Sequence, residues 1–598
     1  MRRAGACAIA LCWLALAGCL QAQESEGDIL RRAMQDELDR SLSELQLEGE
    51  PKPYFISYTV TELESHSMRY VLGSHDSSST NLRRTLFVAV RVGNSELDNT
   101  GFLDVSNDQI AINLGIIGTA LPLRDNYDEL RRVMWLATDA AYKAATKTYS
   151  AKRSALENQI VGSRTPDFSE EEPHLYLEES DQLGFSLEEL AGIAREVSQA
   201  FADQPNVFAS SAHVQSTVSS RTYLDTEGNH NRLYTPQCTV GATARTQALD
   251  GAAIHDSTYT YSRSCSDLPA IDSLRAKAVA MAQRLEARRD AEPLYVYSGP
   301  VLFEPDAAAH FLNQVLAKLL GATSVPETGN PQWDSNLEQV ANPFVAKIDA
   351  RVFPRTISVF NDPTISDYQG RPLLGSYAVD AEGMPTRRTE LISNGILKTL
   401  LTTRDPVNKL VNSTGSHRGY GNPLPGNLFI QPESGLSMDE LRTELIELAK
   451  ENGSEFALLV RKMQSMEDFD GSESPLDELF QTQFAGGISA MPAIDVVKIY
   501  TDGREVQVLP LVVTDFVDSH FRDIVATSAE TVHADVAISP FANMNILSLF
   551  TEGISALHGG KEFISIITPA LLFEDLSLRS AVGFKPNLPA VPHPLAQD

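Results

Sequence analysis

The stretch Val301–Gly321, VLFEPDAAAHFLNQVLAKLLG, lies near the middle of the 598-residue chain and predicts a strand end followed by one amphipathic helix. Pro305 suits the first helical position, where its missing N–H costs nothing, and Gly321 suits the position after the last turn. The polar half of the wheel carries His310, Asn313, Gln314 and Lys318. At 100° per residue, apolar side chains fill the other half: Phe311, Leu312, Val315, Leu316, Leu319 and Leu320.

This helix and the segments after it resemble the core of the TldD/PmbA metalloprotease family, whose catalytic members carry His-Glu-x-x-x-His on the helix. The resemblance continues through DAEGMPTRRTELISNGILKTLLTTRDPVNKLVNSTGSHRGYGNP (Asp380–Pro423) and ends in ITPALLFEDLSL (Ile567–Leu578). It covers roughly the C-terminal half of the chain. The resemblance implies an α+β fold, in which an N-terminal α+β domain precedes a C-terminal antiparallel, barrel-like sheet wrapped around a central helix at about residues 305–320.

Laid over the family motif, this sequence reads Asn313-Gln314-Val315-Leu316-Ala317-Lys318. A zinc protease needs neutral imidazoles or thiolates as ligands and a carboxylate that takes a proton from the metal-bound water. Asn313 is a poor zinc ligand, Gln314 cannot act as a base, and Lys318 repels the ion. The family's remaining ligand is a cysteine near the chain's end, and no cysteine follows Asp470. We therefore expect no intact catalytic residue and no cofactor, with zinc only through a non-standard ligand set.

The spacing of the two histidines in the family motif also bears on the shape of the helix. Two ligands five residues apart lie about 140° apart on a regular helix, so the family motif needs a local distortion. Ala317, a strong helix former, replaces the family's glycine and predicts a regular helix with Gln314 and Lys318 on one face. Two interpretations stay open: either Lys318 supplies a positive charge near the former ion position, or Asn313, Gln314 and Lys318 form a solvated face.

The twelve histidines offer material for a different metal site. His310 shares the polar face of the helix, His417 lies in a glycine-rich loop, and His558 lies where the family's cysteine would fall. A cluster of these three would make the chain an active metallopeptidase that cleaves unfolded peptides. The alternative is that each is an ordinary surface or core residue.

The glycine-rich loop Ser413–Tyr420, STGSHRGY, suggests binding rather than catalysis. Its His417, Arg418 and Tyr420 can hold a peptide backbone or a carboxylate, although a loop shaped only by its glycines is the alternative. The family's catalytic subunit works in a heterodimer with a homologue that lacks the His-Glu motif. The resemblance therefore implies a non-catalytic subunit that binds peptides and pairs with a catalytic homologue, or a homodimer.

Chain length and net charge limit the number of domains and the kinds of partner. A chain of 598 residues predicts two large domains, placed here at residues 23–290 and 291–598. A net charge of −30 argues against nucleic acid as a partner, because phosphate binding needs a basic surface. It argues equally against docking on an anionic membrane face.

Residues 1–22 predict a signal peptide rather than part of the fold. Arg2 and Arg3 precede an apolar run, Ala4–Gly18, that is too short to span a membrane well. Residues 16–19, LAGC, resemble a lipoprotein box with Cys19 as the lipidated residue, whereas cleavage after Ala22 would give a soluble exported protein. We expect a periplasmic protein or outer-membrane lipoprotein, with secretion as the alternative and membrane contact only through an N-terminal lipid.

The cysteines outside the predicted signal peptide allow two interpretations. An exported chain permits a Cys238–Cys265 disulfide, but two free, buried thiols are the alternative.

Sequence patterns predict helices at Gly27–Leu47, Asp128–Ala151, Ser186–Phe201, Ser273–Arg289 and Ser437–Asn452. They also predict strands that include Tyr54–Thr61, Met68–Leu72, Thr85–Val92, Ile494–Tyr500, Val506–Val513 and Ile564–Phe573.

Overall fold

The computed structural model describes residues 26–105, 118–157, 164–179, 186–249, 251, 253–418, 422–465, 490–538 and 562–581. The predicted signal peptide, with Cys19, lies outside these residues. Within them, every helix is too short or too polar to cross a membrane.

The first part of the chain forms a seven-stranded sheet, the N-terminal sheet, in the order β3-β2-β1-β5-β6-β4, with β7 beside β6. Its strands are β1 (Pro53–Val71), β2 (Ser74–Val92), β3 (Thr119–Ala120), β4 (Leu175–Leu177), β5 (Ala209–Asp225), β6 (His230–Gln247) and β7 (Ala253–Ser262). The prediction of separate strands at Tyr54–Thr61 and Met68–Leu72 is wrong. They are one strand, β1, because the polar residues between them pair with β2 on one side and β5 on the other.

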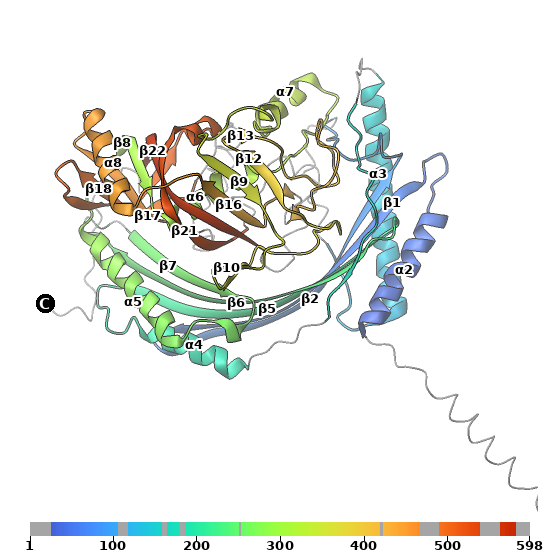
Figure 1. The fold of residues 1–598 in the computed structure, drawn as a ribbon. Coiled ribbons are helices and arrows are strands. Elements are labelled where there is room, and N and C mark those ends of the chain that lie inside the picture. The colour runs from blue at the N-terminus through green and yellow to red at the C-terminus, as the bar shows by residue number, and fades with distance from the viewer. Residues whose placement is uncertain are drawn as a thin grey trace, which may run out of the picture.

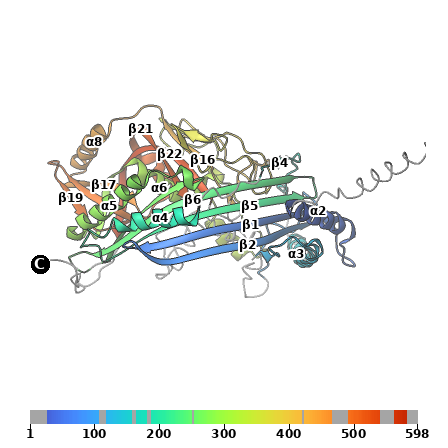
Figure 2. The same cartoon turned by 90° about the horizontal axis from the view of Figure 1, so that it is seen from below.

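Four helices accompany this sheet: α2 (Glu26–Glu44), α3 (Tyr127–Leu156), α4 (Leu187–Gln199) and α5 (Ile271–Ala287). The long strands run side by side, with α4 over one end and α2 and α3 at the other (Figure 2). Ser186 and Glu189 form the predicted capping box at the start of α4. The open question about the cysteines is resolved by a disulfide between Cys238 in β6 and Cys265 after β7.

The rest of the chain forms an eleven-stranded sheet, the C-terminal sheet, in the order β13-β12-β9-β16-β22-β20-β18-β17-β8, with β19 beside β18 and β21 beside β22. Because β22 also pairs with β8, five of these strands close a ring. Its strands are β8 (Val296–Phe303), β9 (Ile357–Asn361), β12 (Thr389–Ser393), β13 (Ile396–Leu397), β16 (Asn427–Pro432), β17 (Phe456–Met463), β18 (Ala493–Tyr500), β19 (Glu505–Val508), β20 (Leu511–Thr514), β21 (Ile524–Ala537) and β22 (Phe563–Ser580).

Most neighbours in this sheet are antiparallel, as expected, but β16 runs parallel to β22 and β17 parallel to β8. The predicted strand Val506–Val513 is two strands: β19 pairs with β18, whereas β20 pairs mainly with β22. Pro510 lies between them, and proline cannot donate to a sheet ladder. Two further helices, α7 (Pro331–Gln339) and α8 (Met438–Glu451), complete this part of the fold.

The predicted central helix is α6 (Pro305–Val315), which packs against β22, β21 and β17. Its aromatic side chain Phe311 stacks on Phe303 of β8, with ring centroids 4.6 Å apart, and meets Phe516 edge-on at 5.3 Å. The main hydrophobic core of the protein gathers around this helix. The predicted arrangement of a barrel-like sheet around a central helix is confirmed.

The prediction of a regular helix through Lys318 is wrong. The α-helix ends at Val315, and a 3₁₀ turn, η3 (Ala317–Leu320), follows Leu316. Asn342 donates its side-chain amide to the carbonyls of Leu319 (2.9 Å) and Gly321 (2.6 Å). These tertiary hydrogen bonds draw the last turn away from helical geometry and override the high helix propensity at position 317.

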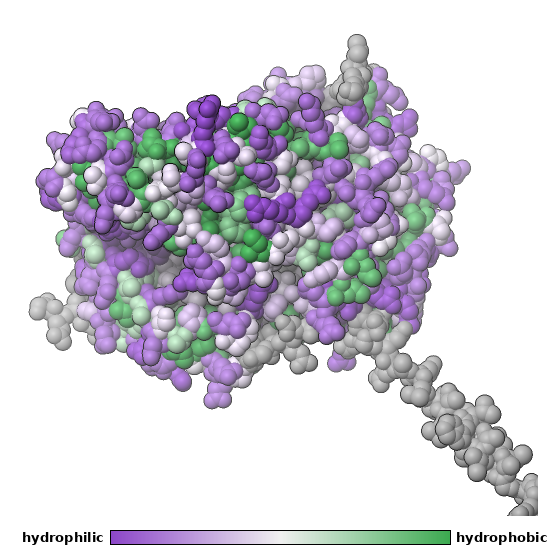
Figure 3. Space-filling view, viewed as in Figure 1, coloured by the Kyte–Doolittle hydropathy of each residue, from purple (hydrophilic) through white to green (hydrophobic). Residues whose placement is uncertain are grey.

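The two sheets face each other. The N-terminal sheet curves like a trough, with α4 and α5 on its outer, convex side, and the C-terminal elements lie in its concavity (Figure 1). Much of the face seen in Figure 3 is hydrophilic, which agrees with the net charge of −30. The arrangement leaves polar residues on the concave side of the N-terminal sheet opposite loops of the C-terminal part.

Truncation of the central aromatic cluster should destabilise the protein strongly. We expect Phe311→Ala to lower the free energy of unfolding by about 3–5 kcal/mol, because it leaves a cavity among fully buried rings. Urea unfolding followed by circular dichroism measures the change. Trp135→Ala on α3, where the side chain is 46% exposed, is the control and should change stability by only about 0.5 kcal/mol. Equal effects of the two substitutions would contradict this assignment of the core.

Candidate functional site

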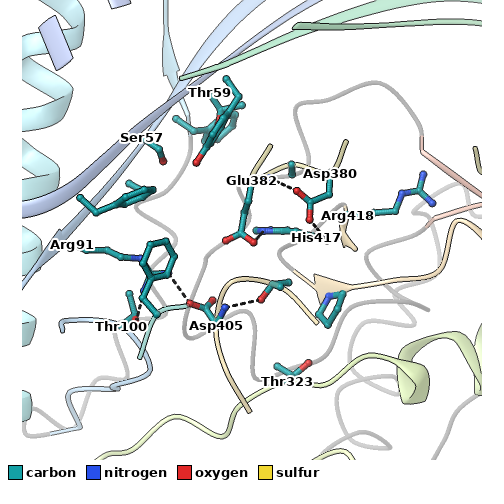
Figure 4. Close-up of a pocket in the computed structure, with 18 of the residues that line it drawn as sticks. Ser57, Thr59, Arg91, Thr100, Thr323, Asp380, Glu382, Asp405, His417 and Arg418 are labelled. Carbon is teal, nitrogen blue, oxygen red and sulfur yellow. Dashed lines mark hydrogen bonds and ion pairs between the residues drawn. The ribbon is translucent and has the colours of Figure 1, made fainter. Parts of the chain in front are cut away.

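A cavity of about 1350 Å³ lies between the N-terminal sheet and loops of the C-terminal part. The sheet contributes Ser57 and Thr59 of β1 and Arg91 of β2, while the loops contribute Asp380 and His417 (Figure 4). Hydroxyl and charged groups from segments more than 300 residues apart therefore meet in one place.

A buried carboxylate, Asp380, organises one wall of this cavity. Its Oδ1 accepts backbone N–H groups of Glu382 (2.9 Å) and Met384 (3.0 Å), and its Oδ2 accepts the N–H of His417 (3.0 Å). Three backbone donors on one carboxylate tie the loop at residues 380–384 to strand β14 (His417–Arg418). The positions of Glu382 and His417 thus depend on Asp380.

The side chains of Glu382 and His417 lie against each other next to it. The Nδ1 of His417 lies 3.3 Å from Oε2 of Glu382, and the same oxygen accepts the backbone N–H of Arg404 at 2.9 Å. The nearby imidazole and these hydrogen bonds outweigh burial and lower the pKa of Glu382, while burial and the charge of Glu382 raise the pKa of Asp380 to about 6. Of these two carboxyl groups, Asp380 therefore has the higher pKa.

Arg91 of the N-terminal sheet forms a second set of ion pairs, one of them with a loop of the C-terminal part. Arg91 donates from Nη2 to Asp405 (2.6 Å) and from Nη1 to Asp98 (2.9 Å). Burial raises the pKa of the Asp405 carboxyl, and the adjacent Arg91 opposes this effect. Figure 4 shows Arg91 and Asp405 together on one side of the cavity and Arg418 on the other.

The positions that match the family motif lie elsewhere. Asn313 and Gln314 are 0% and 2% exposed, and the Oε1 of Gln314 accepts the backbone N–H of Met491 at 2.7 Å. The solvated-face interpretation is therefore wrong for these two residues, because the ring of strands encloses them. Lys318 is partly buried, and burial lowers its pKa to about 8, which favours the interpretation of an internal cation near the former ion position.

Comparison with known proteins identifies relatives of the C-terminal part of this chain. A model described as PmbA/TldA metallopeptidase C-terminal domain matches residues 297–469. A metalloprotease of Methanothermobacter thermautotrophicus is 28% identical over 146 residues, which are 24% of this chain and 28% of the relative. A metalloprotease of Methanocaldococcus jannaschii is 29% identical over 137 residues, 22% of this chain and 27% of the relative. The predicted resemblance to the TldD/PmbA family is confirmed for the C-terminal domain at residues 297–469.

The matches to these two relatives span less than a third of their length. Solved structures extend the likeness of fold to nearly the whole chain. A proposed modulator of a DNA gyrase from Thermotoga maritima is 15% identical with a TM-score of 0.56, over 91% of this chain and 99% of that one. TldE from Thermococcus kodakarensis is 13% identical with a TM-score of 0.52, over 92% and 100%.

The side chains at the TldD/PmbA motif positions do not fit a zinc ion. Carboxamides at positions 313 and 314 and an ammonium at position 318 provide neither an imidazole, a thiolate nor a carboxylate. In addition, the oxygen of the Gln314 carboxamide is already taken by Met491. We therefore assign no catalytic step to these three residues.

The structure describes only two residues of the alternative ligand set, His310 and His417. His417 lines the cavity beside Glu382, His310 lies on α6 and does not line it, and His558 lies outside the described residues. Across those residues, no three His, Cys, Asp or Glu side chains are grouped to hold a metal ion.

The predicted peptide-binding residues are brought to the cavity in part. His417 and Arg418 line it, and Tyr420 lies outside the described residues. Arg418 is buried, and its Nη1 donates to the carbonyls of Pro425 (2.9 Å) and Phe563 (2.7 Å). Its guanidinium therefore fixes the wall of the cavity.

Sequence reasoning missed several charged groups at this site. Asp380 and Glu382 lie in the block that carried the family resemblance, so a signal for them was present. Arg91, Arg221 and Arg263 lie on or beside strands of the N-terminal sheet, where no motif marks them. Only the pairing of β1, β2, β5 and β7 within one sheet brings them to the cavity.

The raised pKa of Asp380 predicts a pH dependence of stability. Because an unfolded aspartate has a pKa of about 3.9, the folded protein keeps this proton up to about pH 6 while the unfolded chain has lost it. The stabilisation from the protonated group is therefore complete below about pH 4 and is lost as the pH rises through 6. The melting temperature of the wild type minus that of Asp380→Asn should fall between pH 4 and 7.

Glu382→Gln is the matched variant for this experiment. It removes the negative charge that helps to raise the pKa of Asp380. The melting temperature of Glu382→Gln should therefore fall less between pH 4 and 7 than that of the wild type. A difference between wild type and Asp380→Asn that does not vary with pH would contradict the raised pKa.

The lowered pKa of Lys318 predicts that a neutral residue is tolerated better. Lys318→Met should raise the melting temperature at pH 7, because the charged ammonium is disfavoured by burial. The gain should shrink as the pH rises above about 8, where the folded lysine loses its proton before the unfolded one does. Lys450→Met, at an exposed position on α8, controls for the loss of one charge. A lower melting temperature of Lys318→Met at pH 7 would show that the cation itself is needed there.

Proposed function

We propose that this protein is an exported, catalytically inactive member of the TldD/PmbA family that binds a peptide in the cavity between its two sheets. The observation that carries the proposal is the set of Asn313, Gln314 and Lys318 at the motif positions, which replaces both ligands and the general base. Inactivity follows from the chemistry of these side chains, and we propose that no cofactor is bound.

The size and lining of the cavity support a peptide as the ligand. Sites for small molecules usually measure about 300–1,000 Å³, and this cavity is larger, at about 1350 Å³. Its walls offer hydroxyl groups from β1 and charged groups such as His417 and Arg91. A peptide presents a backbone amide and carbonyl at every residue, so this dense set of polar groups suits it.

We further propose that the protein pairs with a homologous catalytic subunit that carries the intact His-Glu motif, with a homodimer as the alternative. The family resemblance supports the first arrangement. The segment at residues 1–22 supports export, either to the periplasm or, through Cys19, as an outer-membrane lipoprotein.

Metal content tests the proposed inactivity. We expect well under one equivalent of zinc in the mature protein after dialysis against zinc and removal of the excess, because the motif side chains are poor ligands. Elemental analysis by mass spectrometry gives the ratio, and a TldD/PmbA homologue with an intact motif serves as the positive control. One equivalent of tightly held zinc would overturn the proposal. Substitution of His310, His417 and His558 in turn would then identify the ligands of an active metallopeptidase.

A further inference from the structure

The strand β2 lies at an open edge of the N-terminal sheet, next to the cavity. It pairs with β1 on one side, whereas on the other side β3 covers only Thr85 and Leu86. Among the described residues, no further strand pairs with this outer side between Phe87 and Val92. All six residues from Leu86 to Arg91 line the cavity. Because successive side chains of a strand point to opposite faces, a cavity lined by both sets passes around the edge of the sheet.

The backbone groups of the even-numbered residues of β2 point to this open side. The carbonyl of Val90 accepts the side-chain amide of Asn99 at 3.2 Å, and the N–H of Val92 donates to Oδ1 of Asn99 at 2.8 Å. Because backbone groups alternate between the two sides of a strand, the N–H and C=O of Val88 and the N–H of Val90 point the same way. Within the described residues, the structure records no hydrogen bond for these three groups.

This open stretch of β2 is short and closed at both ends. The pairing with β3 stops at Leu86, and Asn99 occupies the carbonyl of Val90. Four residues of a strand span about 13 Å, so the stretch from Phe87 to Val90 matches a few residues of an extended chain. Unpaired backbone groups at a sheet edge form a template for a further strand. A peptide can reach this stretch inside the cavity, whereas a second folded copy would need a longer, exposed edge.

The two faces next to the open stretch differ in chemistry. On the concave side, Ser57 and Thr59 of β1 project into the cavity (Figure 4). On the other side, Ala137 and Ala141 of α3 line the cavity and pack against the same hydrophobic cluster as Val88. A strand added beside β2 would therefore direct alternate side chains towards hydroxyl groups and towards small apolar residues.

We infer that the peptide binds in an extended conformation, as an added strand beside β2, through the N–H and C=O of Val88 and the N–H of Val90. This inference rests on the proposed peptide binding and adds the surface that holds the peptide backbone. Hydrogen bonds between main chains carry this mode of binding, and side chains at alternate positions give it specificity. Peptides that alternate polar and small apolar residues suit the two faces best.

A series of N-methylated peptides tests the inference by isothermal titration calorimetry on the full mature chain. The parent is the N-acetylated, C-amidated heptapeptide Ser-Ser-Ala-Val-Ala-Ser-Ser, and three variants are methylated on the amide nitrogen of the valine or of one neighbouring alanine. In an added strand only alternate N–H groups point to β2. We expect methylation to weaken binding about tenfold either at the valine alone or at the two alanines alone.

Proline substitutions in β2 test the same contact from the side of the protein. Val88→Pro removes the outward N–H and leaves the pairing with β1 intact, so it should bind the parent peptide about tenfold more weakly than Val88→Thr, which keeps that N–H. Ser78→Pro is the control, because Ser78 is an exposed residue with the same outward direction in β2 and does not line the cavity. It should bind like the wild type. If Val88→Pro fails to fold, the N-methylated series on the wild type still decides.

Hydrogen exchange shows whether the edge is free before the peptide arrives. The amides of Val88 and Val90 should exchange fast in the free protein and at least tenfold more slowly with saturating parent peptide, as measured by mass spectrometry with residue-level fragmentation. Slow exchange of both amides without peptide would show that this stretch is already covered, and would overturn the inference.

The binding data separate failure of the inference from failure of the proposed function. Equal affinities for the parent and all three methylated peptides would exclude an added strand and leave the proposed peptide binding standing. Equal binding by Val88→Pro and Val88→Thr would place the peptide backbone elsewhere in the cavity. No detectable binding of any peptide would overturn the proposed peptide binding and the added strand with it.

Discussion

In the C-terminal sheet, β22 pairs with β20 on one side and with β8 on the other, and so closes a ring of strands around α6. The second half of α6 after His310 is buried there, so its polar side chains Asn313 and Gln314 need partners inside the protein. Gln314 finds one in the backbone of Met491, and Asn342 satisfies the carbonyls at the end of η3. The same enclosure lowers the pKa of Lys318. The chemistry available at the motif positions follows from this enclosure.

The cavity depends on a different set of contacts, which are mainly polar. Arg91 and Arg404 lie on the ring of Phe168, each with its guanidinium carbon 3.9 Å from the ring centroid. Arg91 reaches Asp405 in the C-terminal part, and Arg404 reaches Glu227 in the N-terminal part at 2.6 Å. These reciprocal ion pairs, in which both arginines are buried, hold the N-terminal sheet against the loops of the C-terminal part. Asp380 extends the network through its three backbone donors.

The sequence predicts the parts of this protein that depend on local patterns. Pro305 and the apolar stripe place the start and the buried face of α6, and Ser186 with Glu189 places the start of α4. The break at Leu316 escapes prediction because hydrogen bonds from distant residues cause it. Proximity of Cys238 and Cys265 likewise depends on the pairing of β6 with β7. At the cavity, the loop sequence predicts His417, whereas Arg221 in β5 and Arg263 directly after β7 carry no motif that would mark them.

The motif positions and the lining of the cavity are made by different residues. Asn313, Gln314 and Lys318 are held in the ring around α6, and none of them is among the described residues that line the cavity. The cavity walls come from the N-terminal sheet and from C-terminal segments that include residues 322–325 and 376–382. Substitutions on α6 change the charge and hydrogen bonding inside the ring and leave those walls intact. A change at the motif positions therefore removes metal ligands without replacing any side chain that lines the cavity.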